Sequence, residues 1–198
     1  MRPPERSPER DAAIDALLPN VAFDGWTTAA LRRAAGPDAD LLFPGGAADM
    51  IEAYCDLADR RMEAASAGIA GRLPARVRGV IALRLAQNRP HKEAVRRAVA
   101  ILSLPRNARL AACCTARTVD AIWHAAGDTS SDFSWYTKRA LLTGVYATTL
   151  LAWLRDPSEA DEATLAFLDR RLAGVARIGR LRRRIEERVG GLRKPRTA

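Results

Sequence analysis

The segment that most constrains the fold is a run of fifteen residues, 140–154, in which no side chain carries a charge. An α-helix that is apolar on every face is normally buried, and fifteen residues are fewer than the roughly 20 that span a bilayer. Short polar side chains at 128–132 lie upstream of this run, and such side chains accept hydrogen bonds from the free N–H groups of a first helical turn. The sequence therefore predicts a buried core helix that begins near Phe133.

Small side chains stand among bulky ones inside this predicted helix. Gly144 and Ala147 lie beside the larger Val145, Tyr146 and Leu150. Small residues let neighbouring helices pack closely, and they also leave room for a ligand cavity. The residues alone keep both interpretations open.

Aromatic and cationic residues gather at the start of the same helix. Phe133, Trp135 and Tyr136 come one turn before Lys138 and Arg139. Trp, Tyr and Arg supply many hot spots of protein interfaces, so the cluster is typical of a docking anchor. A surface cluster that is satisfied locally fits the pattern equally well.

Helical spacing of apolar residues continues through the chain, and no run shows the β-branched alternation of a strand. The length of 198 residues and the hydrophobic content of 48% suit one medium-sized domain. We predict an all-α fold of about ten helices. Its expected parts are a disordered stretch at 1–7, a helix-turn-helix-like region at 8–64, a larger helical bundle at 65–176, and a basic amphipathic helix and tail at 177–198.

Prolines and glycines set the expected helix boundaries. A proline suits the first turn of a helix, so we expect helices to begin at Pro74, Pro90 and Pro105. A first helix is expected to end at Pro19. After Pro157 we expect one more helix, followed by a separate arginine-rich one.

Two short helices followed by a longer one near the N-terminus resemble a helix-turn-helix in outline. Between Gly36 and Phe43 there is room for only six residues, and two of them are Asp38 and Asp40. A recognition helix needs length to reach base edges and avoids carboxylates that face phosphates. We therefore interpret this region as a remnant that does not bind nucleic acid.

The net charge of +9 belongs mainly to the C-terminus. From Arg177 onward there are nine basic and two acidic residues, so +7 falls on this segment and +2 on the rest. Apolar residues recur there at steps of three and four, which is typical of a basic amphipathic helix. Such a helix lies on a membrane, docks in a partner groove or packs on its own domain, and we favour the membrane. The candidate membrane-binding residues are Ile178, Leu181, Arg182, Ile185 and Val189.

Residues with catalytic or metal-binding chemistry are few and scattered. His91 and His124 have no carboxylate or cysteine at ligand spacing, so we predict no catalytic site and no metal site. Cys55, Cys113 and Cys114 form no even disulfide framework, and we interpret them as buried thiols of a reducing compartment. We expect no enzyme and no cofactor.

The N-terminal residues suggest a location. They include no apolar segment of a secretory signal, and Glu5, Glu9 and Asp11 are unlike an organelle transit peptide. We expect a cytoplasmic protein that is peripherally associated with the inner face of the membrane.

Several motifs together resemble a known family. They are LPARVRGVIALRL from Leu73, AVRRAVAILSLPRNA from Ala94, GDTSSDFSWYTKRALLTGVYATT from Gly127 and FLDRRL from Phe167. In this order they resemble the lipid-binding accessory proteins of ubiquinone (coenzyme Q) biosynthesis, the ninth protein of the COQ set. FDGW and LFPGGAADMIE nearer the N-terminus resemble the bacterial branch.

The resemblance implies a homodimer with the fold of TetR regulators that has exchanged DNA binding for isoprenoid lipid binding. Such proteins present quinone intermediates to the demethoxyubiquinone hydroxylase, so the hydroxylase, an isoprenoid lipid and a membrane surface are the implied partners. The motif DFxWYT supplies the implied hydroxylase-binding residues Asp132, Phe133, Trp135 and Tyr136, with Ser134 as a departure. The ligand is expected to be an isoprenoid quinone or a phospholipid. Its expected lining is Leu141, Gly144, Val145, Ala147, Thr148 and Leu151, and a Phe at Gly144 is expected to reduce bound lipid.

A ligand-responsive TetR-type repressor is the alternative function. In that case the same pocket senses a small molecule, and the N-terminal helices bind operator DNA. Salt-dependent binding to duplex DNA favours this alternative, whereas copurifying quinone or phospholipid favours the lipid carrier.

Overall fold

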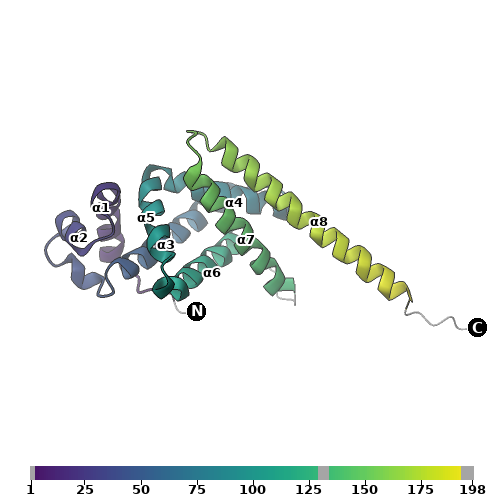
Figure 1. Ribbon diagram of the computed structural model, residues 1–198, viewed down its shortest axis with the longest axis horizontal. Coiled ribbons are helices and arrows are strands. Elements are labelled where there is room, and N and C mark those ends of the chain that lie inside the picture. Colours follow the sequence, from purple (N-terminus) through teal and green to yellow (C-terminus); the bar gives the residue numbers. More distant parts are fainter. Residues whose placement is uncertain (1–2, 129–133, 193–198) are drawn as a thin grey trace, which may run out of the picture.

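The computed structural model describes residues 3–128 and 134–192, with the side chains of 134–135 and 178–192 outside the description. Within these ranges the chain forms eight α-helices, four short 3-10 helices and no strand (Figure 1). The all-α class is therefore confirmed, with eight α-helices where about ten helices were predicted. The α-helices are α1 Pro8–Asp24, α2 Thr28–Ala35, α3 Ala47–Ala65, α4 Leu73–Asn88, α5 Lys92–Leu102, α6 Ala108–Ala125, α7 Ser134–Arg155 and α8 Glu162–Leu192. The 3-10 helices are η1 Ala39–Leu42, η2 Ser66–Gly68, η3 Arg89–His91 and η4 Pro105–Asn107.

Helix α1 corrects one predicted boundary, because it continues through Pro19 to Asp24. Proline inside a helix removes one backbone hydrogen bond, which favours an end at that point. Here the buried stripe of Leu17 and Leu18 continues on the far side of the proline with Val21, which is also buried. Tertiary packing of this stripe outweighs the lost hydrogen bond.

The N-terminal region has a short turn where a recognition helix would lie. The four residues of η1 form one 3-10 turn between α2 and α3, as the spacing predicted. Asp40 of this turn accepts two hydrogen bonds from the Arg32 guanidinium, with N···O distances of 2.9 and 2.6 Å. The carboxylate is thereby held against α2.

Helix α3 runs through the centre of the molecule and packs against α1, α4 and α6 (Figure 1). Its inward residues recur at helical spacing, and Met50, Ile51 and Met62 are fully buried. Helices α5, α6 and α7 contact one another around the same core. The bundle of α3 to α7 is therefore where side chains from five helices converge.

Helix α7 is the predicted core helix, but it is not buried on every face. Leu142, Tyr146 and Trp153 are buried, whereas Gly144 and Leu151 are exposed. The exposed positions share a helix with buried ones because α6 and α8 cover only part of its circumference. The uncharged sequence of 140–154 predicted burial on every face, but the neighbouring helices bury only part of the α7 surface.

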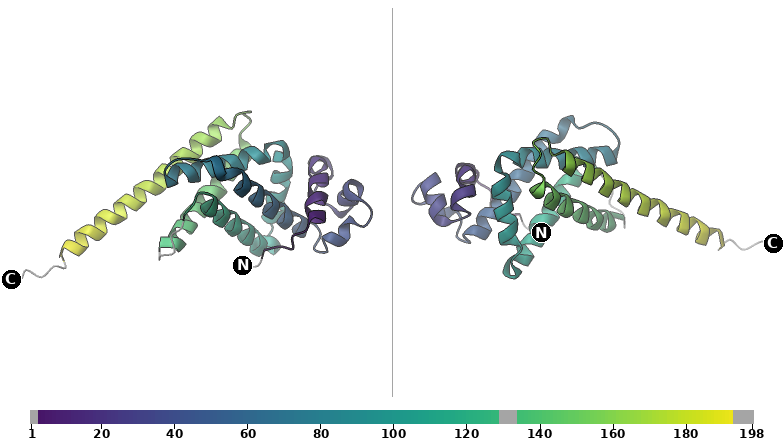
Figure 2. Two further views of the ribbon diagram at one scale, coloured as in Figure 1. Left: turned by 180° about the vertical axis from the view of Figure 1, so that it is seen from behind. Right: turned by 45° about the horizontal axis from the view of Figure 1, so that its top comes forward.

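Helix α8 is one continuous helix of 31 residues, where the sequence suggested two. No proline or positive-φ residue interrupts it after Asp161, whose φ is 52°. Its first part lies along α7 and α4, and its backbone then extends well beyond the rest of the molecule in every view (Figures 1 and 2). None of the described helices combines the length and the apolar character needed to cross a bilayer.

Candidate ligand-binding cavity

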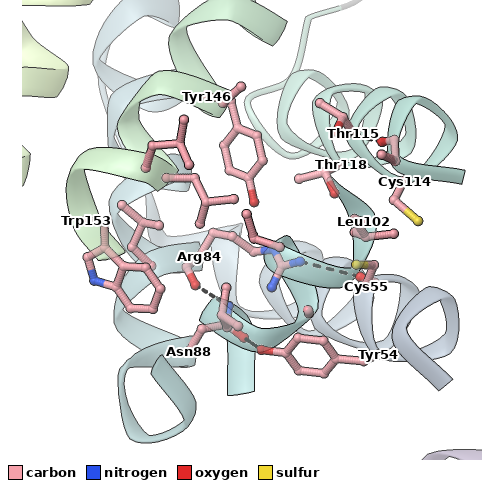
Figure 3. A pocket seen from close by; sticks show the side chains of 18 of the residues that line it. Tyr54, Cys55, Arg84, Asn88, Leu102, Cys114, Thr115, Thr118, Tyr146 and Trp153 are labelled. Atoms are coloured by element: carbon pink, nitrogen blue, oxygen red, sulfur yellow. Dashed lines mark hydrogen bonds between the residues drawn. The ribbon is translucent and has the colours of Figure 1, made fainter. Parts of the chain in front are cut away.

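A cavity of about 300 Å³ lies inside the bundle of α3 to α7 (Figure 3). It is lined mainly by apolar side chains, and several polar groups lie among them. Such an arrangement is typical of small-molecule sites, in which a few polar groups orient a largely apolar ligand. The lining residues are Tyr54, Cys55, Arg84, Leu85, Asn88, Val95, Ala98, Val99, Leu102, Ser103, Ala111, Cys114, Thr115, Thr118, Tyr146, Ala147, Leu150, Leu151 and Trp153.

The apolar part of the wall comes mainly from α5 and α7. Helix α5 places Val95, Val99 and Leu102 on one side at steps of three and four, and all three face the cavity. Helix α7 contributes Leu150 and Leu151 from the other side. Leu151 lines the cavity and is 47% exposed, and Ser103 at the end of α5 also lines it and is exposed, so the cavity reaches the molecular surface beside these two residues.

The polar part of the wall is built around Arg84 of α4. Its guanidinium forms an ion pair with Asp59 of α3 at 3.0 Å, and both side chains are buried. Thr118 of α6 donates a hydrogen bond to the other carboxylate oxygen at 2.9 Å. Burial raises the pKa of Asp59 to about 6 against the opposing effect of Arg84. Burial lowers the pKa of Arg84, but the Asp59 charge, together with Tyr146, Tyr54 and Cys55, outweighs burial and raises this pKa.

Two tyrosines border the same polar region. The hydroxyl of Tyr54 donates a short hydrogen bond to the side-chain oxygen of Asn88, and the Asn88 amide donates to the carbonyl of Arg84 at 2.6 Å. The hydroxyl of Tyr146 points into the cavity toward the Arg84 guanidinium (Figure 3). Burial raises the pKa of Tyr146 to about 12, so this hydroxyl is neutral at ordinary pH.

Two free thiols complete this wall. Cys55 of α3 and Cys114 of α6 both line the cavity and hydrogen-bond to each other. This bond and burial raise the pKa of Cys55, so it stays protonated. The bond from Cys55 lowers the pKa of Cys114, and Arg117, whose guanidinium nitrogen is 3.5 Å from its sulfur, acts in the same direction. Of the three cysteines interpreted as buried thiols, Cys114 is buried, whereas Cys55 and Cys113 are half-buried.

The six residues expected to line a lipid site fall on different sides of α7. Ala147 and Leu151 line the cavity. Leu141, Gly144 and Val145 line a separate depression against α8. Thr148 borders neither and donates a hydrogen bond to the Gly144 carbonyl at 2.6 Å. A Cβ at Gly144 would meet no atom within 4 Å, and Gly144 lines the depression and not the cavity, so we expect a bulky residue there to leave the cavity open.

Sequence reasoning missed the polar wall, although one signal for Arg84 was available. Val77, Val80, Ile81, Arg84 and Leu85 recur at helical spacing, and all five are buried. A charged residue within an apolar stripe is unusual, because a buried charge needs a partner. The stripe of α4 therefore marked Arg84 as a residue with a special environment.

The other predicted site residues are only partly within the description. Asp132 and Phe133 lie outside the described residues, and Trp135 is described only as part of the α7 backbone. Tyr136 is 72% exposed, as a docking residue must be. The candidate membrane-binding residues belong to the described backbone of α8, and their side chains lie outside the description: Ile178, Leu181, Arg182, Ile185 and Val189.

Comparison with known proteins supports the resemblance found in the sequence. The COQ9 family model matches residues 108–179, which comprise α6, α7 and part of α8. "Ubiquinone biosynthesis protein COQ9, mitochondrial" of Xenopus tropicalis is 42% identical over 103 residues, covering 52% of this chain and 32% of the relative. The Homo sapiens protein of that name is 36% identical over 110 residues, with 56% and 35% coverage.

A fungal relative aligns over more of the chain. The Schizosaccharomyces pombe protein, "Ubiquinone biosynthesis protein coq9, mitochondrial", is 33% identical over 149 residues, which are 74% of this chain and 59% of the relative. The alignments thus span about a third of the animal relatives' length and over half of the fungal one.

A solved structure shares the fold. It is the crystal structure of the TetR transcriptional regulator from Nitrosomonas europaea, with a TM-score of 0.68 and 27% sequence identity. The match covers 86% of this chain and 99% of the regulator. The chain is therefore an all-helical protein of TetR-like fold that carries a COQ9 family domain and is homologous to the COQ9 proteins of ubiquinone biosynthesis.

Proposed function

We propose that this protein acts in ubiquinone biosynthesis as a non-catalytic lipid-binding protein that presents isoprenoid quinone intermediates to the demethoxyubiquinone hydroxylase. The observation that carries the proposal is the apolar cavity between α3 and α7, which opens at Leu151. The homology to COQ9 proteins supports the pathway.

The size of the cavity suits part of such a lipid. A dry apolar cavity of about 150 Å³ accommodates a benzene ring, and this one measures about 300 Å³. It has room for a substituted ring and the first part of a side chain. A long prenyl chain must therefore leave the cavity, and the opening at Leu151 gives it a route.

The polar groups of the cavity support a carrier better than an enzyme. Arg84 and Asp59 neutralise each other, Cys55 keeps its proton, and the Cys114 sulfur is engaged by Cys55 and Arg117. A general base or a nucleophile has to be free to exchange a proton or attack the substrate. These groups instead suit the orientation of a ligand.

Presentation of the lipid requires further surfaces. The exposed Tyr136 at the start of α7, together with Trp135, is the proposed contact for the hydroxylase. The basic C-terminal part of α8 is the proposed contact with the membrane surface at the lipid source. We also propose a homodimer.

Mass spectrometry of lipids extracted from the purified protein tests the proposal. Ala147→Phe places a large side chain in the cavity and is expected to abolish quinone copurification, at a cost in stability of about 1–3 kcal/mol. Gly144→Phe is the matched control, one turn away on the same helix, and is expected to retain the lipid. Equal lipid content in both folded variants would contradict the proposed cavity.

A ligand-responsive repressor is a second candidate, favoured by the likeness to a TetR transcriptional regulator. The single turn of η1 and the ion pair of Asp40 with Arg32 make its N-terminal region a poor reader of DNA. Salt-dependent binding of duplex DNA by a chain that ends at Arg177 would support the repressor. Absence of such binding at low salt would support the carrier.

A further inference from the structure

Two hydrogen-bond donors at the polar part of the cavity have no partner within the protein. Among the described backbone and side-chain atoms, the hydroxyl of Tyr146 and the Nη1 group of Arg84 have no hydrogen-bond partner. Both side chains are more than nine-tenths buried, with exposures of 7% and 5%. Buried polar groups are nearly always hydrogen-bonded, so two free donors that face one cavity indicate a ligand acceptor.

The charge around these donors decides which acceptor fits. The Arg84 guanidinium is already paired with Asp59, whose other oxygen is bound by Thr118. The nearby Asp56 is paired with Arg6 and Arg60 on the outer side of α3. Near Cys114, Arg117 is likewise paired, with Glu52 at 2.7 Å. The charges at the polar end are therefore compensated before a ligand enters.

A compensated buried site disfavours a second anion. A phosphate would bring a negative charge into a place where the positive charge of Arg84 already faces the Asp59 carboxylate. A carbonyl or phenol oxygen accepts the same hydrogen bonds without adding charge, and desolvating it costs far less. The site thus favours a neutral oxygen.

The apolar wall fixes the orientation of the ligand. Leu151, where the cavity opens, belongs to α7 and follows the apolar Leu150. Arg84 of α4 lies near Asn88 and Tyr54 (Figure 3). A ring that reaches the two donors leaves its hydrocarbon chain among Val99, Leu150 and Leu151. A ligand with the opposite orientation would place its polar end among these aliphatic side chains.

We infer that Tyr146 and Arg84 form a head-group site for a neutral, oxygen-bearing ring, a quinone or a phenol, which enters ring first and whose ring oxygen accepts hydrogen bonds from both. The inference rests on the proposed function and adds a specificity: the cavity selects a quinone ring over a phospholipid head group. Tyr146 and Arg84 are its specificity-determining residues.

Isothermal titration with three soluble probes tests the inference. The first is 1,4-benzoquinone with two methoxy groups, a methyl group and one prenyl unit; the second is prenylated toluene, which lacks ring oxygens; the third is monomeric dihexanoyl phosphatidylglycerol. Tyr146→Phe removes only the hydroxyl and leaves the ring that packs in the core. It is expected to weaken quinone binding about 3- to 10-fold, the usual worth of one hydrogen bond, and to leave prenylated toluene unaffected.

Thr143→Val is the matched control, because it also removes one hydroxyl from α7, at a position outside the cavity lining. It is expected to bind all three probes as the wild type does. Wild-type protein is expected to bind the quinone more tightly than either other probe.

The outcomes separate the head-group site from the proposed function. Equal affinity for quinone and prenylated toluene, with no effect of Tyr146→Phe, would overturn the head-group site while the lipid cavity stands. Tighter binding of phosphatidylglycerol than of the quinone, with displacement of the quinone, would also overturn the head-group site. If the wild type binds neither the quinone nor prenylated toluene, the proposed function itself is contradicted.

Discussion

The guanidinium of Arg84 and the carboxylate of Asp59 join α4 to α3 through an ion pair of 3.0 Å behind the cavity wall. Both side chains are buried, so each charge depends on the other. A buried charge that loses its partner is costly, whereas an exposed pair contributes little. The same ion pair therefore stabilises the bundle and holds the Arg84 guanidinium in the cavity wall.

Removal of one partner is expected to destabilise the fold strongly. Asp59→Ala leaves the Arg84 charge buried and unpaired and should lower the free energy of unfolding by about 3–5 kcal/mol in urea denaturation. Asp15→Ala is the control, because it breaks the exposed pair with Arg61 and should cost about 1 kcal/mol or less. Equal losses in the two variants would show that burial of the Arg84 pair has no special role.

The loop between α7 and α8 carries a pH-dependent contribution to stability. Asp156 accepts hydrogen bonds from the side chains of Ser158 and Thr164 and from their backbone N–H groups, at 2.7 to 3.0 Å. These bonds, those from the two side chains first, lower the pKa of Asp156 below its usual value of 3.8. A carboxyl with a lowered folded-state pKa stabilises the protein above its unfolded-state pKa, and this contribution is lost as the pH falls below that value.

Asp156→Asn tests this contribution, since an amide does not titrate. The wild type is expected to be the more stable protein at pH 6, and its advantage in free energy of unfolding is expected to shrink between pH 4 and pH 2. Denaturation curves across this range measure the difference. An advantage that is constant with pH would contradict the assignment.

The start of α7 is expected to contribute to partner binding and little to folding. Tyr136 is 72% exposed, so Tyr136→Ala should leave the melting temperature nearly unchanged. If Tyr136 is part of the contact with the hydroxylase, its loss should weaken binding by about 2 kcal/mol, which surface plasmon resonance detects. Trp135→Ala is the companion variant. A large fall in its melting temperature would assign Trp135 to the core instead.

The basic end of α8 is expected to bind anionic membranes. The segment from Arg177 onward carries +7, and each base near an anionic leaflet contributes about 1 kcal/mol. A chain that ends at Arg177 should stay helical but no longer float with anionic liposomes at low salt. The full chain should float less as salt screens the attraction. Flotation of the shortened chain at the level of the full chain would rule out this anchor.

Local sequence signals predicted the start of α4 and came within three residues of the starts of α5 and α6, because the causes of these boundaries are mainly local. Pro74 begins the first turn of α4, whereas Pro90 and Pro105 lie in the short 3-10 turns η3 and η4, so that α5 begins at Lys92 and α6 at Ala108. The end of α1 was wrong because packing of Val21 outweighs the effect of Pro19. Tertiary contacts decided that boundary, and no local pattern reports them.

The cavity was predictable only in part. The small and apolar residues of α7 indicated that a cavity was possible, and Ala147 does line it. Its polar wall depends on how α3 and α4 are rotated toward each other, which brings Asp59 to Arg84. Such rotation follows from the packing of whole helix faces. The apolar spacing around Arg84 marked an unusual residue but could not name its partner.

The most direct test of the central claim is photo-crosslinking with a prenylated benzoquinone that carries a diazirine on its chain, followed by peptide mass spectrometry. If the ring lies at Tyr146 and the chain leaves past Leu151, the labelled peptides should come from α5 and α7, around Val99, Leu102 and Leu150. Excess unlabelled quinone should remove the label, and Ala147→Phe should prevent it. Competable labelling confined to α8, or unaltered by Ala147→Phe, would contradict the account.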